Sequence, residues 1–261
     1  MSAEAPKSAV VYARVLANSR ITPNMARITL GGPEVAAVGC GGFDQRIKLL
    51  FGRPGQLVPR LPAAANWYQS WLDTPEEERA VMRTYTIRAH RPGEIDVDFV
   101  LHGDHGPASA WALRAAEGDV IGIIGSGVGQ AGAAAIEYRP GGARRQLIAG
   151  DETALPAISA ILEALPGDVR VRAFVEVPTE ADIQELDLRC QADITWLPRS
   201  GAGPSLLEAV RAVEIEGEDW YAWVAGETGA VRDLRRHLRE RGCDGDRGYF
   251  GGYWRHDGQG G

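Results

Sequence analysis

Arg83-Thr84-Tyr85-Thr86-Ile87-Arg88 is the stretch on which our prediction of the fold rests. Its alternation predicts a β-strand that turns Arg83, Tyr85 and Ile87 to one face. An arginine there offers a planar fork for a diphosphate, and a tyrosine offers a flat ring and a hydroxyl for an isoalloxazine. Thr86 adds a short hydrogen-bonding group. The stretch fits a flavin-binding strand, and taken alone it fits equally well a half-exposed strand with charged ends.

The residues that follow favour the flavin interpretation. Residues 94–101 alternate again, and the apolar members that face a core are Ile95, Val97, Phe99 and Leu101. Residues 102–112 are typical of a tight turn that opens a helix at Pro107. The free amides of Ala108 and Ser109 would attract a phosphate, helped by the helix dipole. Together with Arg83 they would grip one diphosphate from two sides, whereas a capped helix with nothing bound is the alternative.

Size and composition limit the possible functions. A chain of 261 residues suggests two domains, since one domain usually has about 100–200 residues. A net charge of −7 argues against nucleic acid or an anionic membrane surface as the main partner. Cys40, Cys190 and Cys243 are too scattered for a disulfide framework or a zinc site. Without a signal peptide or a long apolar segment, we expect a cytoplasmic protein that does not insert into a membrane.

The rhythm of the sequence changes near Pro140-Gly141-Gly142, which predicts two domains, 1–140 and 141–261. Before the change, short apolar runs broken by Gly, Pro and Asn predict an antiparallel barrel. A long excursion interrupts it, and the tryptophans there, Trp67 and Trp71, either shape a ligand mouth or pin the excursion to the barrel. After the change, strands are predicted at 146–149, 169–175, 194–197 and 221–225, alternating with helices at 154–165, 204–213 and 227–241. This alternation indicates a parallel sheet covered by helices.

A glycine-rich run at residues 127–132 formally matches the GxGxxG dinucleotide fingerprint. That fingerprint needs a helix to receive the pyrophosphate. Here the run belongs to the last predicted barrel strand and reaches Pro140 within a few residues. We therefore interpret it as an interdomain loop.

Two strand-to-helix turns of the second half predict a nucleotide site. The first, Gly150-Asp151-Glu152-Thr153, follows a buried strand, which is where parallel α/β sheets bind ligands. The second, Gly226-Glu227, repeats the arrangement before the last helix. Asp151 or Thr153 would otherwise simply cap a helix. Two such turns at one sheet edge favour a site over two independent caps.

Five blocks, taken in order, resemble the siderophore-interacting proteins, FAD-dependent ferric-siderophore reductases of the ferredoxin-reductase superfamily. The blocks are residues 83–88 (RTYTIR), 98–103 (DFVLHG), 150–156 (GDETALP), 225–227 (AGE) and 252–255 (GYWR). The resemblance covers nearly the whole chain. It implies an N-terminal six-stranded antiparallel flavin-binding barrel and a C-terminal parallel α/β domain for NADH or NADPH, with a C-terminal segment that returns to the flavin site.

The resemblance also implies roles for single residues. The residues expected to bind FAD are Arg83, Tyr85, Thr86, His102, Gly103, Ala108, Ser109, Asp151, Thr153, Ala154 and Trp254. Those expected at the nicotinamide nucleotide, from the two turns described above, are Gly150, Glu152, Gly226 and Glu227. Lys48 and Arg255 match positions associated with the ferric siderophore. Arg199 would either contact the adenosine ribose or a 2′-phosphate, or be an exposed loop arginine.

The implied activity is electron transfer from NADH or NADPH through the flavin to Fe(III) in a siderophore, with release of Fe(II). Such a reaction needs no acid–base residue of the protein, so we expect none, and no protein-bound metal. One alternative is another flavin reductase of the superfamily, serving a ferredoxin or free flavin. A second is a carrier that only binds the siderophore. A hydrolase using His102, Asp104 and His105 is disfavoured, because their spacing on a glycine-rich turn suits joint metal ligation poorly.

Overall fold

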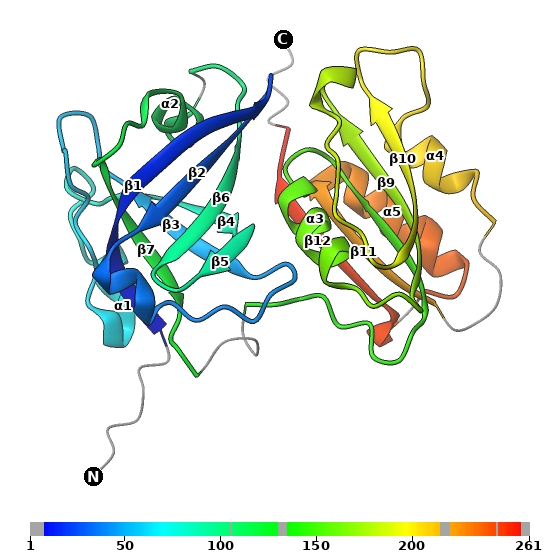
Figure 1. Cartoon of the computed structure of the whole chain (residues 1–261), viewed down its shortest axis with the longest axis horizontal. Helices are drawn as coiled ribbons and strands as arrows, with labels where there is room; N and C mark the ends of the chain where they lie inside the picture. The colour runs from blue at the N-terminus through cyan, green and yellow to red at the C-terminus, as the bar shows by residue number, and fades with distance from the viewer. Residues whose placement is uncertain (1–7, 105, 130–134, 215–219, 244, 257–261) are drawn as a thin grey trace. The chain divides into compact units, whose positions relative to one another are not determined.

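The computed structural model divides the chain into two compact units, Met1–Ile136 and Glu137–Gly261 (Figure 1). It describes residues 8–104, 106–129, 135–214, 220–243 and 245–256. Unit 1 is built from antiparallel strands, and unit 2 alternates parallel strands with helices. No helix within these ranges is long and apolar enough to cross a membrane.

Unit 1 is a curled antiparallel sheet in the order β4-β3-β7-β1-β2-β6-β5. Its strands are β1 (Ser8–Thr22), β2 (Met25–Gly31), β3 (Arg46–Phe51), β4 (Val81–Thr86), β5 (Ala89–Arg91), β6 (Glu94–Val100) and β7 (Val120–Ser126). Helix α1 (Trp67–Leu72) lies in the excursion between β3 and β4, and α2 (Pro107–Arg114) follows β6. The expected antiparallel barrel domain is confirmed.

The strand count differs from the expected six because one stretch of chain serves both ends of the sheet. The end strands β4 and β5 are consecutive, joined by Ile87 and Arg88. The Ile87 N–H donates to the Gln45 carbonyl on the β3 side at 2.9 Å, and the Arg88 N–H donates to the Asp96 carbonyl of β6 at 2.8 Å. The N–H groups of neighbouring residues in a strand point to opposite sides of it, so this stretch hydrogen-bonds to both edges of the sheet. Counted as one strand, β4 and β5 give the six that were predicted.

The barrel core follows the predicted alternation of β6. Ile95, Val97 and Phe99 are fully buried, and Leu101 is 6% exposed. The excursion packs on the outside of the sheet, where Trp67 and Trp71 lie against a small buried cluster. The Trp71 indole N–H donates to the Ala80 carbonyl at 2.9 Å. Of the two interpretations of these tryptophans, pinning the excursion to the barrel is the one that the packing supports.

Two carboxylates on the opposite face of β6 are also buried, which the alternation did not predict. Asp98 forms a bidentate ion pair with Arg27, with N–O distances of 2.7 and 2.8 Å. Asp96 pairs with Arg91, both distances being 2.8 Å, and accepts the Thr29 hydroxyl at 2.8 Å. Burial alone would raise the pKa of Asp96, but the hydrogen bonds from Arg91 and Thr29 outweigh it and hold that pKa below its usual value.

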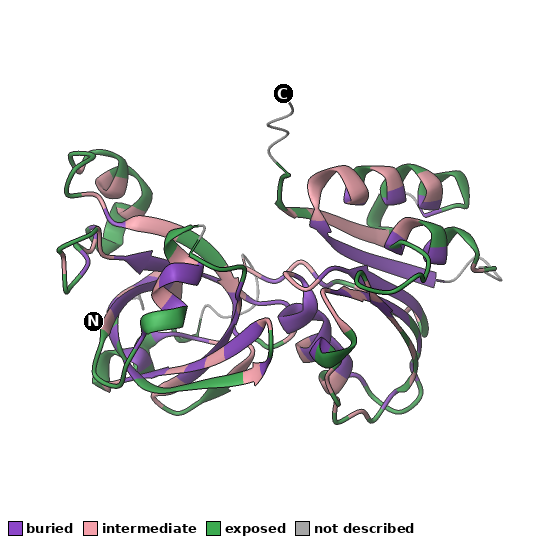
Figure 2. Cartoon of the chain, turned by 90° about the horizontal axis from the view of Figure 1, so that it is seen from above, coloured by how far each residue is buried: buried purple, intermediate pink, exposed green. Residues whose placement is uncertain are grey.

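Unit 2 is a parallel sheet in the order β10-β9-β8-β11-β12. Its strands are β8 (Arg145–Gly150), β9 (Arg170–Val177), β10 (Gln191–Pro198), β11 (Trp220–Glu227) and β12 (Gly248–Trp254). Helices α4 (Leu206–Arg211) and α5 (Thr228–Glu240) share one buried cluster with the sheet, and α3 (Leu155–Ala164) covers the other face (Figure 2). The predicted α/β class is confirmed, with all three helices where the sequence placed them.

Strand β12 was not among the predicted strands. Its sequence, GYFGGYW, contains three glycines, which disfavour strands and hide the alternation. The glycines fit because the strand is crowded: a Cβ at Gly252 would lie 2.7 Å from the Thr228 hydroxyl oxygen, and one at Gly251 would meet the Tyr249 hydroxyl. β12 therefore depends on tertiary contacts with α5 and β11 rather than on local propensity.

Candidate functional site

Strand β4 carries the residues predicted to bind the flavin. In the ladder with β3, Tyr85 lies opposite Ile47 and Arg83 opposite Leu49, so both are on the side of the barrel core. The Arg83 side chain is exposed at the end of that row, donates only to the neighbouring Met82 carbonyl at 2.9 Å, and has no carboxylate partner in the described part of the chain. Arg83 is thus open to an anionic ligand.

Tyr85 is held on an aromatic cluster with Phe99, Trp111 and Phe51. Its ring centroid lies 4.4 Å from that of Phe99, and the Phe99 centroid lies 5.6 Å from that of Trp111 on α2. Phe51 of β3 completes the cluster at 5.4 Å from Trp111. Burial raises the pKa of the Tyr85 phenol, against the opposing effect of the Arg83 charge, so the ring stays neutral. The cluster fixes β4 relative to helix α2.

Helix α2 begins with backbone groups that no side chain caps. Gly106 precedes it with a φ of 121°, and Pro107 occupies the first turn. The buried Ser109 hydroxyl is used within the turn: it accepts the His102 N–H at 3.2 Å and donates to the Gly103 carbonyl at 2.7 Å. An anion could therefore bind the free backbone amides at the start of α2, but not this hydroxyl. The exposed His102 ring lies beside Gly106, at the same end of the helix. His105 lies outside the described residues.

Lys48, the predicted substrate residue of unit 1, lies on the opposite face of the β3–β4 ladder from Tyr85. It pairs with Thr84, and its ammonium donates to the Thr84 hydroxyl at 2.6 Å. Burial, assisted by the charge of Arg46, lowers the pKa of Lys48. The strands therefore do not bring Lys48 and the predicted flavin face together within this sheet. Thr86, predicted to act with Tyr85, is buried opposite Arg46.

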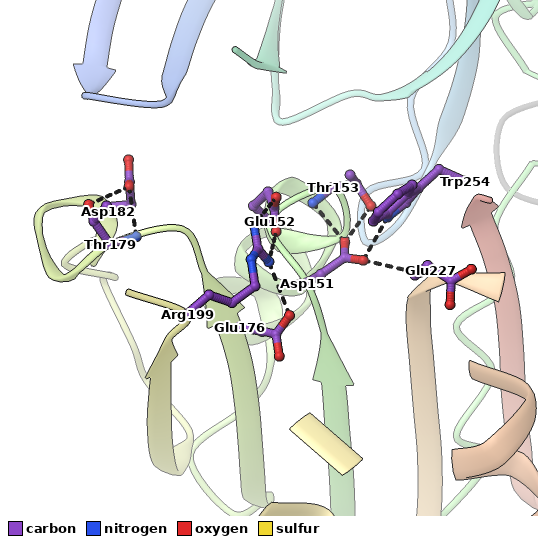
Figure 3. A network of polar contacts seen from close by, with 9 residues as sticks. All are labelled: Asp151, Glu152, Thr153, Glu176, Thr179, Asp182, Arg199, Glu227 and Trp254. Atoms are coloured by element: carbon purple, nitrogen blue, oxygen red, sulfur yellow. Dashed lines mark hydrogen bonds and ion pairs between the residues drawn. The ribbon is translucent and has the colours of Figure 1, made fainter. Parts of the chain in front are cut away.

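In unit 2 the buried carboxylate of Asp151 ties three strand ends together (Figure 3). One of its oxygens accepts the Thr153 N–H at 2.9 Å and the Thr153 hydroxyl at 2.5 Å. The other accepts the Glu227 N–H and the Trp254 indole N–H, both at 2.8 Å. The two predicted turns and the end of β12 are therefore one structure, not independent caps. Burial raises the pKa of Asp151, and the hydrogen bonds from Thr153 and Trp254 oppose that rise.

Two glycines let the backbone come close to this clamp. Gly226 has a φ of 143°, and a Cβ there would lie 2.5 Å from the nearer Asp151 oxygen. A Cβ at Gly150 would lie 2.6 Å from the Ala225 carbonyl oxygen and 2.7 Å from the Ala154 Cβ. Ala154 is fully buried, and its N–H donates to the Asp151 carbonyl at 3.0 Å. The Ala154 side chain thus packs the turn from within.

Glu227 and Trp254 occupy the ends of β11 and β12. The Glu227 carboxylate caps α5 by accepting the Ala230 N–H at 2.8 Å, and hydrogen bonds from the Gly229 and Ala230 amides lower its pKa. Trp254 is 39% exposed although its N–H is bound to Asp151. Arg255, the second predicted substrate residue, follows it and is exposed. Whether these two face a flavin stays a prediction.

Arg199, at the end of β10, is held by two carboxylates. Its terminal nitrogens bind both oxygens of Glu152, at 2.6 and 2.5 Å, and one of them also binds Glu176 at 3.0 Å (Figure 3). These contacts, first those with Glu152, raise the pKa of the guanidinium further. Arg199 is thus an exposed arginine in the turn after β10 that is also paired with two carboxylates, and whether it contacts a nucleotide stays a prediction. Sequence reasoning missed Glu176, whose signal is its place at the end of the strand after the first turn.

Comparisons with known proteins cover both units. The siderophore-interacting FAD-binding domain family matches residues 14–130, and the siderophore-interacting protein family matches residues 143–257. Ferric vibriobactin reductase ViuB of Vibrio cholerae is 32% identical over 94% of this chain and 90% of its own length.

Two crystal structures are similar over nearly the whole chain. The siderophore utilization protein from T. fusca is 34% identical, with a TM-score of 0.81 over 97% of this chain and 95% of its own. The siderophore-interacting protein SipS from Aeromonas hydrophila is 35% identical, with a TM-score of 0.77 over 97% and 94% of the two chains.

Proposed function

The chain belongs to the siderophore-interacting protein family, and we propose that it is a flavoprotein reductase that uses FAD and a nicotinamide nucleotide to reduce ferric siderophores. Unit 1 would hold FAD, and unit 2 would hold NADH or NADPH. The observation that carries the proposal is the pairing of the open Arg83 and the uncapped start of α2 on a shared aromatic cluster. A carrier would not need this anion site together with a second, nucleotide-like edge in unit 2.

The residues of unit 1 fit FAD by their chemistry. An arginine without a carboxylate partner and an uncapped helix start both attract a diphosphate, one by charge-assisted hydrogen bonds and the other by amides and dipole. Tyr85 offers an aromatic edge and a neutral hydroxyl, which stays protonated because burial raises its pKa. In the proposal Arg83, Ala108 and Ser109 hold the diphosphate, Ser109 through its backbone. Tyr85 orients the ring system.

The carboxyl edge of unit 2 fits a nicotinamide nucleotide. Gly150 and Gly226 let the two turns pack closely against Ala154, Ala225 and Asp151, and Asp151 holds these turns in register at the strand ends, where parallel sheets bind nucleotides. Trp254 keeps an exposed ring at the same edge, fixed by its indole N–H. In the proposal these residues bind and orient the nucleotide, and none of them moves a proton.

Bound FAD would supply the chemistry that turns a two-electron donor into a source of single electrons. The substrate is Fe(III) held by hard oxygen ligands, and reduction to Fe(II) weakens every metal–oxygen contact because the metal charge falls. Exposed cations such as Arg255 would attract an anionic iron complex. In the proposal, dependence on a cellular nicotinamide nucleotide would put the reaction in the cytoplasm.

The test is an anaerobic visible spectrum of the FAD-reconstituted protein. Spectra are recorded before nucleotide, after NADH or NADPH, and after a ferric siderophore together with a ferrous chelator. We expect flavin bands that bleach with nucleotide and return as the ferrous complex appears. A protein that retains no FAD would contradict the proposal and leave a siderophore carrier as the explanation. Bleaching without Fe(II) formation would point instead to a reductase for another acceptor.

A further inference from the structure

At the ends of β8, β9 and β10 one arginine is held by two carboxylates. Arg199 is the one cation in the network of Figure 3, whose carboxylates are Asp151, Glu152, Glu176, Asp182 and Glu227. Both terminal nitrogens of Arg199 are already bound to carboxylate oxygens. The arginine that sequence reasoning considered for a 2′-phosphate is therefore occupied by the protein itself.

The two carboxylates that hold Arg199 are mostly buried. Glu176 also accepts the Leu206 N–H at the start of α4, at 3.3 Å. Its side chain is 20% exposed, and that of Glu152 is 13% exposed. Both carboxylates are therefore largely buried beside the guanidinium, and Glu176 also accepts a backbone amide. Arg199 with its two partners carries a net charge of −1, counted as one cation and two anions.

We propose that these residues make the protein select NADH over NADPH, with Glu152 and Glu176 as the specificity-determining residues. A 2′-phosphate adds about two negative charges at neutral pH and would meet Glu152 and Glu176, whose described cationic partner, Arg199, is already paired with both. A ribose diol is neutral and can donate hydrogen bonds, and carboxylate oxygens keep lone pairs to accept them. Glu176 ends the strand after the first turn, where an acidic side chain meets the adenosine ribose in dinucleotide-binding sheets.

This inference rests on the proposed function, because it assumes that a nicotinamide nucleotide binds at this edge. The first test compares anaerobic flavin reduction by NADH and NADPH in the wild-type protein and in Glu152→Gln, Glu176→Gln and the double variant. Glutamine keeps the shape and removes the charge. The matched control is Glu240→Gln, an exposed glutamate at the far end of α5, which runs back from this edge.

We expect kcat/KM for NADH to exceed that for NADPH at least tenfold in the wild type and in Glu240→Gln. In the double variant the ratio should fall at least tenfold, mainly through a gain with NADPH, because Arg199 becomes available. An equal or greater rate with NADPH in the wild type would overturn the inference and leave the reductase proposal intact. A double variant with an unchanged ratio would overturn it as well.

A binding measurement separates this inference from the reductase proposal. Calorimetry with 5′-AMP and adenosine 2′,5′-bisphosphate needs no electron transfer. We expect the wild type to bind 5′-AMP more tightly and the double variant to reverse that order. Tighter binding of the bisphosphate by the wild type would overturn the inference. Failure of both dinucleotides to reduce the flavin would instead refute the proposed function, whatever the binding order.

Discussion

Replacing Asp151 by asparagine tests the clamp that joins the two turns to β12. One carboxylate oxygen of Asp151 accepts two hydrogen bonds from Thr153, one from its N–H and one from its hydroxyl. The other oxygen accepts the Glu227 N–H and the Trp254 indole N–H. An asparagine keeps one oxygen and replaces the other by an NH₂ group, which donates and cannot accept. With its nitrogen toward Thr153, the amide leaves the Thr153 N–H facing another donor, while the Thr153 hydroxyl can turn and accept. In the opposite orientation the Glu227 N–H and the Trp254 indole N–H both face a donor.

The size of the effect follows from these contacts. A hydrogen bond to a charged group contributes about 1.5 to 3 kcal/mol and one between neutral groups about 0.5 to 1.5 kcal/mol, so losing one and weakening the two from Glu227 and Trp254 removes about 3 to 5 kcal/mol. Burial raises the pKa of Asp151, which means that the fold disfavours its charge, and the neutral amide escapes that penalty. We expect a net loss of about 2 to 3 kcal/mol in the free energy of opening unit 2, equivalent to roughly 30- to 150-fold.

Hydrogen exchange of β8 and β11 measures this loss without interference from unit 1. Their amides should exchange roughly 30- to 150-fold faster in Asp151→Asn, if opening is two-state. The matched control is Asp233→Asn, which removes a surface carboxylate paired with Arg236 at 3.1 Å and should change exchange by less than about fivefold. Exchange in Asp151→Asn within a factor of two of the wild type would refute the reasoning.

Three further predictions concern other parts of the structure. Gly226→Ala should destabilise unit 2 by about 3 kcal/mol or more in urea denaturation, because Gly226 has a positive φ and the new Cβ would lie 2.5 Å from an Asp151 carboxylate oxygen. The control is Gly142→Ala, which should be near neutral because no atom lies within 4 Å of the new Cβ. Arg83→Ala should raise the Kd for FAD roughly 10- to 100-fold in fluorescence titration, and unchanged affinity, or an equal loss in the exposed Arg20→Ala, would contradict it. The folded protein lowers the pKa of Asp96, so this carboxylate stabilises unit 1 at pH values above its unfolded pKa of about 3.9. The contribution is lost as the pH falls through the folded pKa. Asp96→Asn should therefore reduce the loss of unfolding free energy that the wild type shows at acidic pH.

The predictable parts of the fold are those decided by local patterns. The alternation of β6 predicted its buried face, and the glycine turns after β8 and β11 predicted where parallel strands end. Asp96 and Asp98 were not predicted as buried, because their partners Arg91 and Arg27 are recognisable only once the strands are paired. Burial of a charge depends on a partner that periodicity does not reveal.

The candidate site shows the same division. The residue types and spacing of Arg83 and Tyr85 indicated which chemistry β4 could offer. The Ser109 hydroxyl hydrogen-bonds within its own turn, and Arg199 is bound by Glu152 and Glu176. Both facts depend on which donors and acceptors the tertiary structure brings together. A sequence lists the donors and acceptors, but their allocation follows from the tertiary structure.

The bridging of both sheet edges by residues 81–91 has a consequence for aggregation. If this stretch detached, the main-chain groups of β3 and β6 would become unpaired at the same moment, and two open edges would be available for pairing with another chain. The segment with the predicted flavin motif thus also covers both edges of the sheet and keeps the barrel from associating edge to edge. Substitutions in residues 81–91 should therefore be assayed for solubility as well as for activity, because one change there can weaken both flavin binding and the pairing of the sheet edges.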